Sequence, residues 1–265
     1  MNPFVDRLQQ TDASALLGTF VMSASPIVAE AIACCGYDYA VVDAEHSPLD
    51  MMQLVHMLQA FSGSATHPIV RVPSNDTVVI KRVLDAGAST ILVPFVESAE
   101  QAVQAVLATR YAPEGVRGMA GLSRASRFGA TPDHFRTANK RQGVVVQLET
   151  PRALENLEEI ASVEGVNALF VGPTDLAGSM GHYGNAQHPE VQEALRTAVR
   201  RCHAVGKPMG TMAGTPELAA SYIAAGLNFV AVTSDLGLIV GQARTTLATL
   251  RTKAQGSSAT SGITY

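Results

Sequence analysis

Eight short apolar runs, rich in β-branched residues, recur along the 265-residue chain, and stretches of helical character separate them. Runs that are apolar at nearly every position indicate strands buried on both faces, as in a parallel sheet. Strands that alternate with helices form an open, doubly wound sheet or a closed barrel. We predict strands at Leu17–Met22, Tyr39–Asp43, Pro68–Val72, Thr90–Phe95, Val144–Glu149, Ala168–Gly172, Met209–Met212 and Phe229–Thr233.

The number of units and the chain length favour the closed barrel. A (β/α)₈ barrel has eight such units and typically about 250 residues. No G-x-G-x-x-G motif follows the first run, which argues against a dinucleotide, and we expect no organic cofactor. We therefore predict an α/β fold, a single (β/α)₈ TIM barrel over residues 1–253. The low-complexity residues 254–265 are expected to form a disordered tail.

Charge and hydropathy exclude several classes of partner. The net charge is −4, the pI is near 6.0 and the basic residues are scattered, so nucleic acid is not expected as a partner. No apolar stretch reaches about 18 residues and no signal peptide is evident, so no membrane partner is expected either. We interpret Cys34 and Cys35 as buried thiols of a protein in the reducing cytoplasm.

Polar side chains gather where the predicted strands end. The second strand runs into Asp43–His46, the third ends at Arg71, the fifth at Gln147–Glu149 and the sixth at Gly172–Asp175. The opposite strand ends carry mostly Gly, Ala, Tyr and Pro. Active sites of (β/α)₈ barrels lie at the carboxyl ends of the strands. Ionisable groups of both signs therefore meet at the end of the barrel where catalysis is expected.

Glu149 and Asp175 are the candidate metal ligands. Gln147 and Glu149 are two residues apart on one strand, so both side chains point into the barrel. A buried, unpaired carboxylate is costly, and a divalent cation relieves that cost. Two carboxylates completed by water or substrate oxygens suit Mg²⁺ or Mn²⁺. The alternative is a metal-free network in which both carboxylates form ion pairs with Arg71.

A histidine and the lysines bear on the mechanism. His46 follows the second strand and could act as a general base, although a packed or capping role is the alternative. An imine mechanism needs a lysine at the catalytic end of the barrel. The lysines fall in helices or ahead of strands, at Lys81, Lys140, Lys207 and Lys253. Schiff-base chemistry is therefore disfavoured.

Five motifs extend these observations. They are VDAEHSP (Val42–Pro48), LVPFVESAEQA (Leu92–Ala102), VVQLET (Val145–Thr150), GPTDLAGSMG (Gly172–Gly181) and HPEV (His188–Val191). In this order they resemble the HpcH/HpaI aldolases, class II pyruvate aldolases of the 4-hydroxy-2-oxoheptanedioate and 2-dehydro-3-deoxyglucarate type. The resemblance runs from Gly18 to about Leu250. It implies a (β/α)₈ barrel of the phosphoenolpyruvate/pyruvate-binding type.

The resemblance assigns roles to individual residues. It implies that Glu149 and Asp175 hold the divalent cation, with Co²⁺ as a further candidate beside Mg²⁺ and Mn²⁺. Arg71 matches the arginine that contacts the keto oxygen of pyruvate and stabilises its enolate. His46 and Asp85 match a catalytic His–Asp dyad.

Other matched residues would bind the two halves of the substrate. The pyruvate half is expected to contact Gln147, Gly172, Pro173, Thr174 and Asp175, where N–H groups at the start of a helix suit a carboxylate. Phe20 stands where many relatives have tryptophan, and Arg117–Phe128 is one residue shorter than in relatives, so the aldehyde side is expected to differ. Candidates for that side are Phe20, Met212, Arg124 and Arg127, and for the two arginines a role as surface or interface ion-pair partners is favoured over substrate contact.

The expected reaction is reversible cleavage of a 4-hydroxy-2-oxo acid into pyruvate and an aldehyde, in aromatic or sugar-acid catabolism. One alternative is an acyl-CoA lyase of the malyl-CoA or citryl-CoA type. The other is a non-catalytic barrel that binds a 2-oxo acid. The resemblance also implies a homo-oligomer, a hexamer or trimer of dimers with exchanged C-terminal helices, whose other partners are small-molecule substrates only.

Overall fold

The computed structural model describes residues 2–10 and 14–258, and its strands close into a parallel barrel. Each strand pairs in parallel with the next in sequence, and β8 returns to β1. The predicted (β/α)₈ fold is confirmed, with every strand boundary within two residues of its prediction. The strands are β1 (Leu16–Val21), β2 (Tyr39–Asp43), β3 (His67–Arg71), β4 (Thr90–Val93), β5 (Gly143–Leu148), β6 (Ala168–Val171), β7 (Met209–Ala213) and β8 (Phe229–Ser234).

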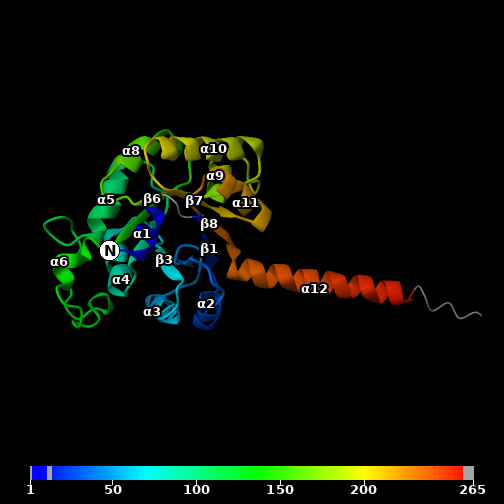
Figure 1. The fold of residues 1–265 in the computed structure, drawn as a ribbon, viewed down its shortest axis with the longest axis horizontal. Helices are drawn as coiled ribbons and strands as arrows, with labels where there is room; N and C mark the ends of the chain where they lie inside the picture. Colours follow the sequence, from blue (N-terminus) through cyan, green and yellow to red (C-terminus); the bar gives the residue numbers. More distant parts are fainter. Residues whose placement is uncertain (1, 11–13, 259–265) are drawn as a thin grey trace, which may run out of the picture.

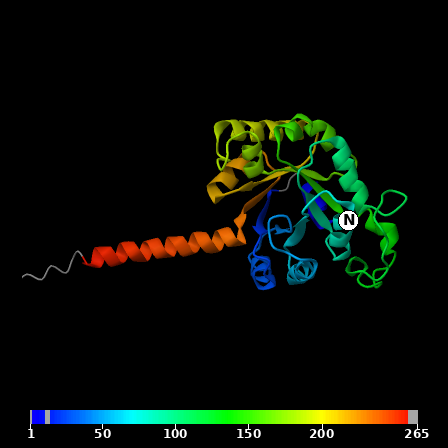
Figure 2. The same cartoon turned by 180° about the vertical axis from the view of Figure 1, so that it is seen from behind.

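Helices surround the barrel, and α12 extends away from it as a long rod beyond its first residues (Figures 1 and 2). Within residues 2–10 and 14–258, none of the helices is both long and apolar enough to cross a membrane. The helices are α1 (Pro3–Leu8), α2 (Pro26–Ala33), α3 (Met51–Ala60), α4 (Thr77–Asp85), α5 (Ala99–Thr109), η1 (Arg124–Ser126), α6 (His134–Ala138), α7 (Pro151–Glu155), α8 (Leu157–Ser162), α9 (Pro173–Ser179), α10 (Pro189–Ala204), α11 (Pro216–Ala224) and α12 (Asp235–Ser258).

The N-terminal helix closes the end of the barrel where the strands begin. The ring of Phe4, on α1, packs edge-on against Tyr39 and Phe229, with ring centroids 5.4 and 5.5 Å apart. Gly18 supplies the space for this layer, because a Cβ there would lie 2.3 Å from the Tyr39 ring. The carboxyl ends of the strands carry the open cavity, which we call the mouth.

The structure contradicts the expected burial of two cysteines and describes only part of the expected C-terminal tail. Cys34 and Cys35 are exposed at the end of α2, so the prediction that they are buried was wrong, whereas Cys202 is buried. The Ala-rich sequence around the pair gave no sign that α2 ends there with both thiols in solvent. Of the expected tail, residues 254–258 belong to α12, and residues 259–265 lie outside the described residues.

Candidate active site

A cavity of about 290 Å³ opens at the mouth of the barrel, and nine of the predicted site residues line it. Part of the lining comes from β3, β5, β6 and the start of α9. Phe20 of β1, Met22 of the turn after β1 and Met212 of β7 complete it. The lining residues are Phe20, Met22, His46, Arg71, Gln147, Phe170, Gly172, Pro173, Thr174, Asp175 and Met212.

Arg71, the last residue of β3, is fixed by two carboxylates. Its Nε and Nη2 donate to the two oxygens of Asp43 at 2.8 and 2.7 Å, and its Nη1 lies 3.2 Å from Glu45 Oε2. The guanidinium also lies over the ring of Phe20, 5.0 Å from its centroid. A paired, buried arginine keeps its charge and has a single orientation. Arg71 is therefore a preorganised cation at the mouth.

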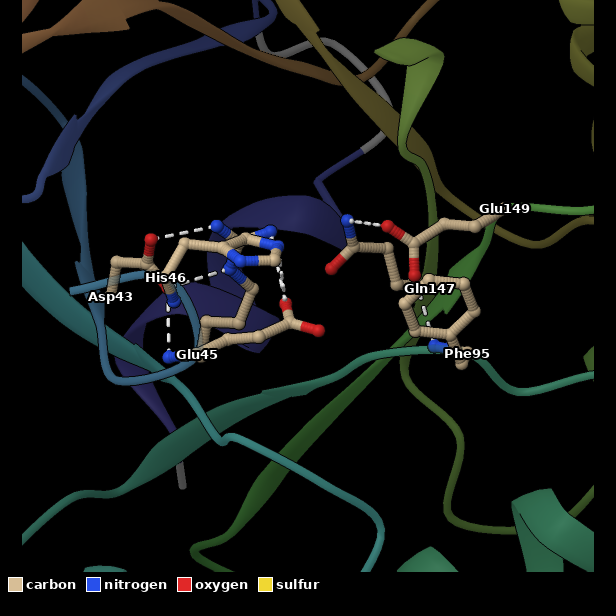
Figure 3. A network of polar contacts seen from close by, with 7 residues as sticks. Asp43, Glu45, His46, Phe95, Gln147 and Glu149 are labelled. Carbon is tan, nitrogen blue, oxygen red and sulfur yellow. Dashed lines mark hydrogen bonds and ion pairs between the residues drawn. The ribbon is translucent and has the colours of Figure 1, made fainter. Parts of the chain in front are cut away.

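Asp43 also shapes the turn that carries His46. The Asp43 carboxylate is fully buried and accepts the N–H groups of Glu45 and His46, at 3.1 and 3.4 Å. The His46 side chain is about half exposed at the rim, with Nε2 3.7 Å from Glu45 Oε2 (Figure 3). Asp43 and Glu45 were not singled out as site residues, although their place at the end of β2 was the available signal.

Glu149 is a buried carboxylate immediately after β5. Its oxygens accept hydrogen bonds from Gln147 Nε2 at 2.7 Å and from the Phe95 backbone N–H at 2.9 Å (Figure 3). Burial is the main reason that the pKa of Glu149 is raised to about 8. Phe95 has a φ of 50°, which is unusual for a bulky residue. Sequence reasoning missed Phe95, because a backbone donor leaves no signal in the residue type.

The residues around Glu149 fit a divalent cation. Among residues 2–10 and 14–258, no ion pair joins Arg71 to Glu149 or Asp175, so the metal-free network considered from the sequence is not formed. Gln147 Oε1, in the lining of the mouth, is buried and has no hydrogen-bond partner in the part of the chain that the structure describes. Carboxylate and amide oxygens without a matching cation are the donor set that Mg²⁺ and Mn²⁺ bind.

Three predicted residues lie elsewhere in the chain. Asp85 ends α4, at the opposite end of the barrel, where Arg117 Nη2 donates to it at 2.6 Å. Arg124 donates to the Ala86 carbonyl at 3.1 Å, and Arg127 follows it in the same loop. The predicted contact between Asp85 and His46 is therefore not formed within one chain. The two arginines do not line the mouth of their own barrel.

A second group of metal-ligand side chains lies outside the mouth. His182, His188 and Glu190 place one ligand atom each within 4.8 Å of one another. However, His188 Nδ1 accepts the Glu190 N–H at 3.3 Å as the cap of α10, and His182 Nε2 lies 2.8 Å from the Glu190 carboxylate. These contacts explain why the three side chains lie together: they cap and stabilise the start of α10.

The fold and the mouth define a (β/α)₈ enzyme that combines buried carboxylates with a fixed arginine. The model of the HpcH/HpaI aldolase/citrate lyase family matches residues 16–241, and the chain belongs to this family. A 2-dehydro-3,6-dideoxy-6-sulfogluconate aldolase of Pseudomonas putida is 48% identical over 90% of this chain and 93% of its own length. A 5-keto-4-deoxy-D-glucarate aldolase of Salmonella arizonae is 46% identical over 84% of this chain and 87% of its own.

A solved structure agrees with these relatives. The crystal structure of an HpcH/HpaI aldolase/citrate lyase family protein from Burkholderia cenocepacia has a TM-score of 0.91 and 36% identity, and the match covers 95% of this chain and 100% of that one. The chain is thus an aldolase, a carbon–carbon lyase. The alternative of a non-catalytic barrel is wrong, and the relatives favour an aldolase over an acyl-CoA lyase.

Proposed function

We propose that this aldolase is metal-dependent and reversibly cleaves a 4-hydroxy-2-oxo acid into pyruvate and an aldehyde. The observation that carries the proposal is the buried Glu149 carboxylate, which accepts a hydrogen bond from Gln147 in the lining of the mouth and is close enough to Asp175 for that charge to add to the rise in pKa that burial causes. Within residues 2–10 and 14–258 it forms no ion pair with a cationic side chain. A buried carboxylate in this setting needs either a proton or a cation. The buried, unpartnered Gln147 Oε1 nearby favours the cation, because a cation is bound by both kinds of oxygen.

Glu149 and Asp175 would hold the cation, with Mg²⁺ or Mn²⁺ as the first candidates and Co²⁺ as another. When bound, the cation polarises the keto oxygen of the substrate and stabilises the negative charge of the enolate. Arg71 adds a fixed positive charge to the same oxygen. The first N–H groups of α9, at Thr174 and Asp175, would bind the substrate carboxylate, because the first N–H groups of a helix have no partner within it. His46 takes the proton of the 4-hydroxyl group as the carbon–carbon bond breaks.

The names of the relatives support one of the two substrate classes over the other. Both curated relatives named above act on sugar-derived oxo acids by their names. We therefore favour a 2-dehydro-3-deoxy sugar acid over 4-hydroxy-2-oxoheptanedioate, and sugar-acid catabolism over aromatic catabolism. The cavity at the mouth, about 290 Å³, is of a size suited to such a small acid.

The proposed dyad of His46 and Asp85 depends on the proposed oligomer. Asp85 lies at the opposite end of its own barrel from His46, so a dyad of these residues requires a second copy of the chain. The homo-oligomer that the resemblance implies, a hexamer or trimer of dimers, would supply that copy. Arg124 and Arg127 lie in the loop beside the end of α4. They would contact an aldehyde only in the mouth of a second copy of the chain.

Metal removal tests the proposed function. Pyruvate release from 2-dehydro-3-deoxyglucarate should vanish in excess chelator and return with Mg²⁺, Mn²⁺ or Co²⁺, while circular dichroism stays unchanged. Glu149→Gln should lower kcat/KM by about a thousandfold or more. Glu155→Gln, an exposed change on α7, is the matched control and should keep full activity. Full turnover in chelator, or inactivation by borohydride with pyruvate, would contradict the proposal.

A further inference from the structure

One side of the mouth is held in place by a buried carboxylate that the reaction itself does not use. Asp235, the first residue of α12, is only 2% exposed. Its Oδ1 accepts the N–H of Met22 at 2.8 Å and its Oδ2 accepts the N–H of Ser23 at 3.1 Å. Oδ1 also accepts the N–H of Leu236 at 2.8 Å. The carboxylate therefore joins the turn after β1 to the start of α12.

Asp235 is held by backbone donors rather than by a cation. Among residues 2–10 and 14–258, no ion pair includes Asp235. A buried carboxylate that binds N–H groups with both oxygens is oriented in two directions at once. An asparagine keeps one oxygen but presents an N–H group where Ser23 also donates. The structure thus requires an acceptor on each side of the residue, which aspartate supplies and asparagine does not.

The surrounding junction leaves little freedom for adjustment. Thr19 donates its hydroxyl to the Val232 carbonyl at 3.2 Å. Thr233 has a φ of 54°, and a Cβ at Gly237 would lie 2.4 Å from Thr233 Oγ1. The pairing of β1 with β8 also shifts register between Gly18 and Phe20. The ends of β1 and β8 and the start of α12 therefore form one close-packed unit.

This unit contributes to the part of the mouth that lies outside the proposed pyruvate site. The pyruvate half is built from Arg71, Gln147 and the start of α9, which come from β3, β5 and β6. Phe20 and Met22, from the β1 end of the unit, line the same cavity, and β1 lies across the closed barrel from β5. Phe20 also lies under the guanidinium of Arg71, so Met22 is the residue of this unit whose position would affect a bound aldehyde more than pyruvate.

We propose that Asp235 is a positioning residue for the aldehyde half of the mouth, acting through the backbone of Met22 and Ser23. The inference rests on the proposed function, because it assumes that pyruvate occupies the other half. It predicts that loss of the two-sided acceptor impairs use of the aldehyde and leaves the chemistry of pyruvate intact. A residue that only stabilised the fold would lower both to the same extent.

Two assays separate these outcomes. Exchange of the C3 protons of pyruvate with D₂O, followed by NMR, measures enolate formation in the pyruvate half alone. The steady-state condensation of pyruvate with glycolaldehyde measures both halves. In Asp235→Asn we expect kcat/KM for glycolaldehyde to fall about tenfold, mainly through KM, with C3 exchange within about twofold of the wild type. Met22→Ala removes part of the wall itself and should give the same split without a buried polar change.

Asp38→Asn is the matched control. Asp38 also accepts a backbone N–H of β1, from Leu17 at 2.8 Å, but at the end of the strand away from the mouth. It should leave both assays unchanged, apart from any loss of thermal stability. If the wild type shows no metal-dependent C3 exchange, the proposed function fails, and the inference fails with it. If exchange is normal in the wild type but falls in parallel with aldehyde use in Asp235→Asn, or if Met22→Ala leaves aldehyde use unchanged, the inference alone is overturned.

Discussion

Position 172 shows how closely the mouth is packed around its carboxylate. A Cβ at Gly172 would lie 2.5 Å from Glu149 Oε1 and 2.8 Å from Gln147 Nε2. Both atoms belong to the hydrogen bond that orients Glu149. The backbone of Gly172, with φ −86° and ψ 97°, is accessible to any residue. The glycine is therefore required for space, and the space is occupied by the candidate metal ligand.

We expect Gly172→Ala to displace Glu149 and to weaken metal binding and catalysis without unfolding the barrel. Misplacement of a catalytic group by about 1 Å typically costs about a hundredfold in rate, so kcat/KM should fall by about that factor. Mn²⁺ binding followed by electron paramagnetic resonance should weaken in parallel. Gly178→Ala, at a position of α9 with nothing near its Cβ, should leave both unchanged. Equal metal affinity in the two variants would show that the added Cβ at position 172 does not displace Glu149.

Among the elements, the strands could be predicted from the sequence and several site contacts could not. The strand runs are buried on both faces, and this leaves a continuous apolar pattern around residues such as Val42 and Val146. Arg71 and Glu149 could be predicted because strand ends fix their place at the mouth. Phe95 contributes a backbone N–H, and Asp235 lies beyond the eighth strand, so neither contact has a local signal. Asp85 is the last residue of α4, and its distance from His46 depends on the three-dimensional packing of that helix, which the sequence alone does not give.

The closed end of the barrel contains a titratable group whose pKa has a consequence for stability. His67 begins β3, its ring stacks on Phe4 of α1, and its Nε2 lies 2.8 Å from Thr90 Oγ1. Burial, and secondarily the charge of Arg7, lower the pKa of His67 from 6.5 to about 4. The folded protein thus keeps this histidine neutral in a pH range where the unfolded chain protonates it.

Stability should therefore fall as the pH drops from about 6.5 towards 4. The unfolded state binds the additional proton in this window, and the shift corresponds to about 3 kcal/mol of unfolding free energy. Urea unfolding of wild type and His67→Gln at pH 4.5 to 7.5 tests this. The difference in unfolding free energy between the two proteins should change with pH in the stated direction. His56→Gln, at an exposed position of α3, is the control. Parallel pH profiles for wild type and His67→Gln would contradict the assignment.

At the scale of the whole molecule, the contacts within a single described chain do not account for the stability of α12. It extends away from the barrel (Figures 1 and 2). Exposed apolar side chains follow one side of it, at Leu238, Ile239, Leu247 and Leu250. A helix with such a side gains its stability from packing against another surface. This agrees with the proposed homo-oligomer with exchanged C-terminal helices.

The double variant Ile239→Glu with Leu247→Glu should disrupt the assembly. Burial of each of these side chains is worth about 1.5–3 kcal/mol, so charges there should weaken association by more than about a hundredfold. Light scattering coupled to size-exclusion chromatography should show a multiple of the 27.8 kDa chain for the wild type and a smaller species for the variant. Ala248→Glu adds a charge to the opposite side of α12 and should leave the mass unchanged. Because the proposed dyad of His46 and Asp85 needs a second copy, the dissociated variant should also lose aldol cleavage. A wild-type protein that is monomeric and fully active would contradict both the assembly and the shared dyad.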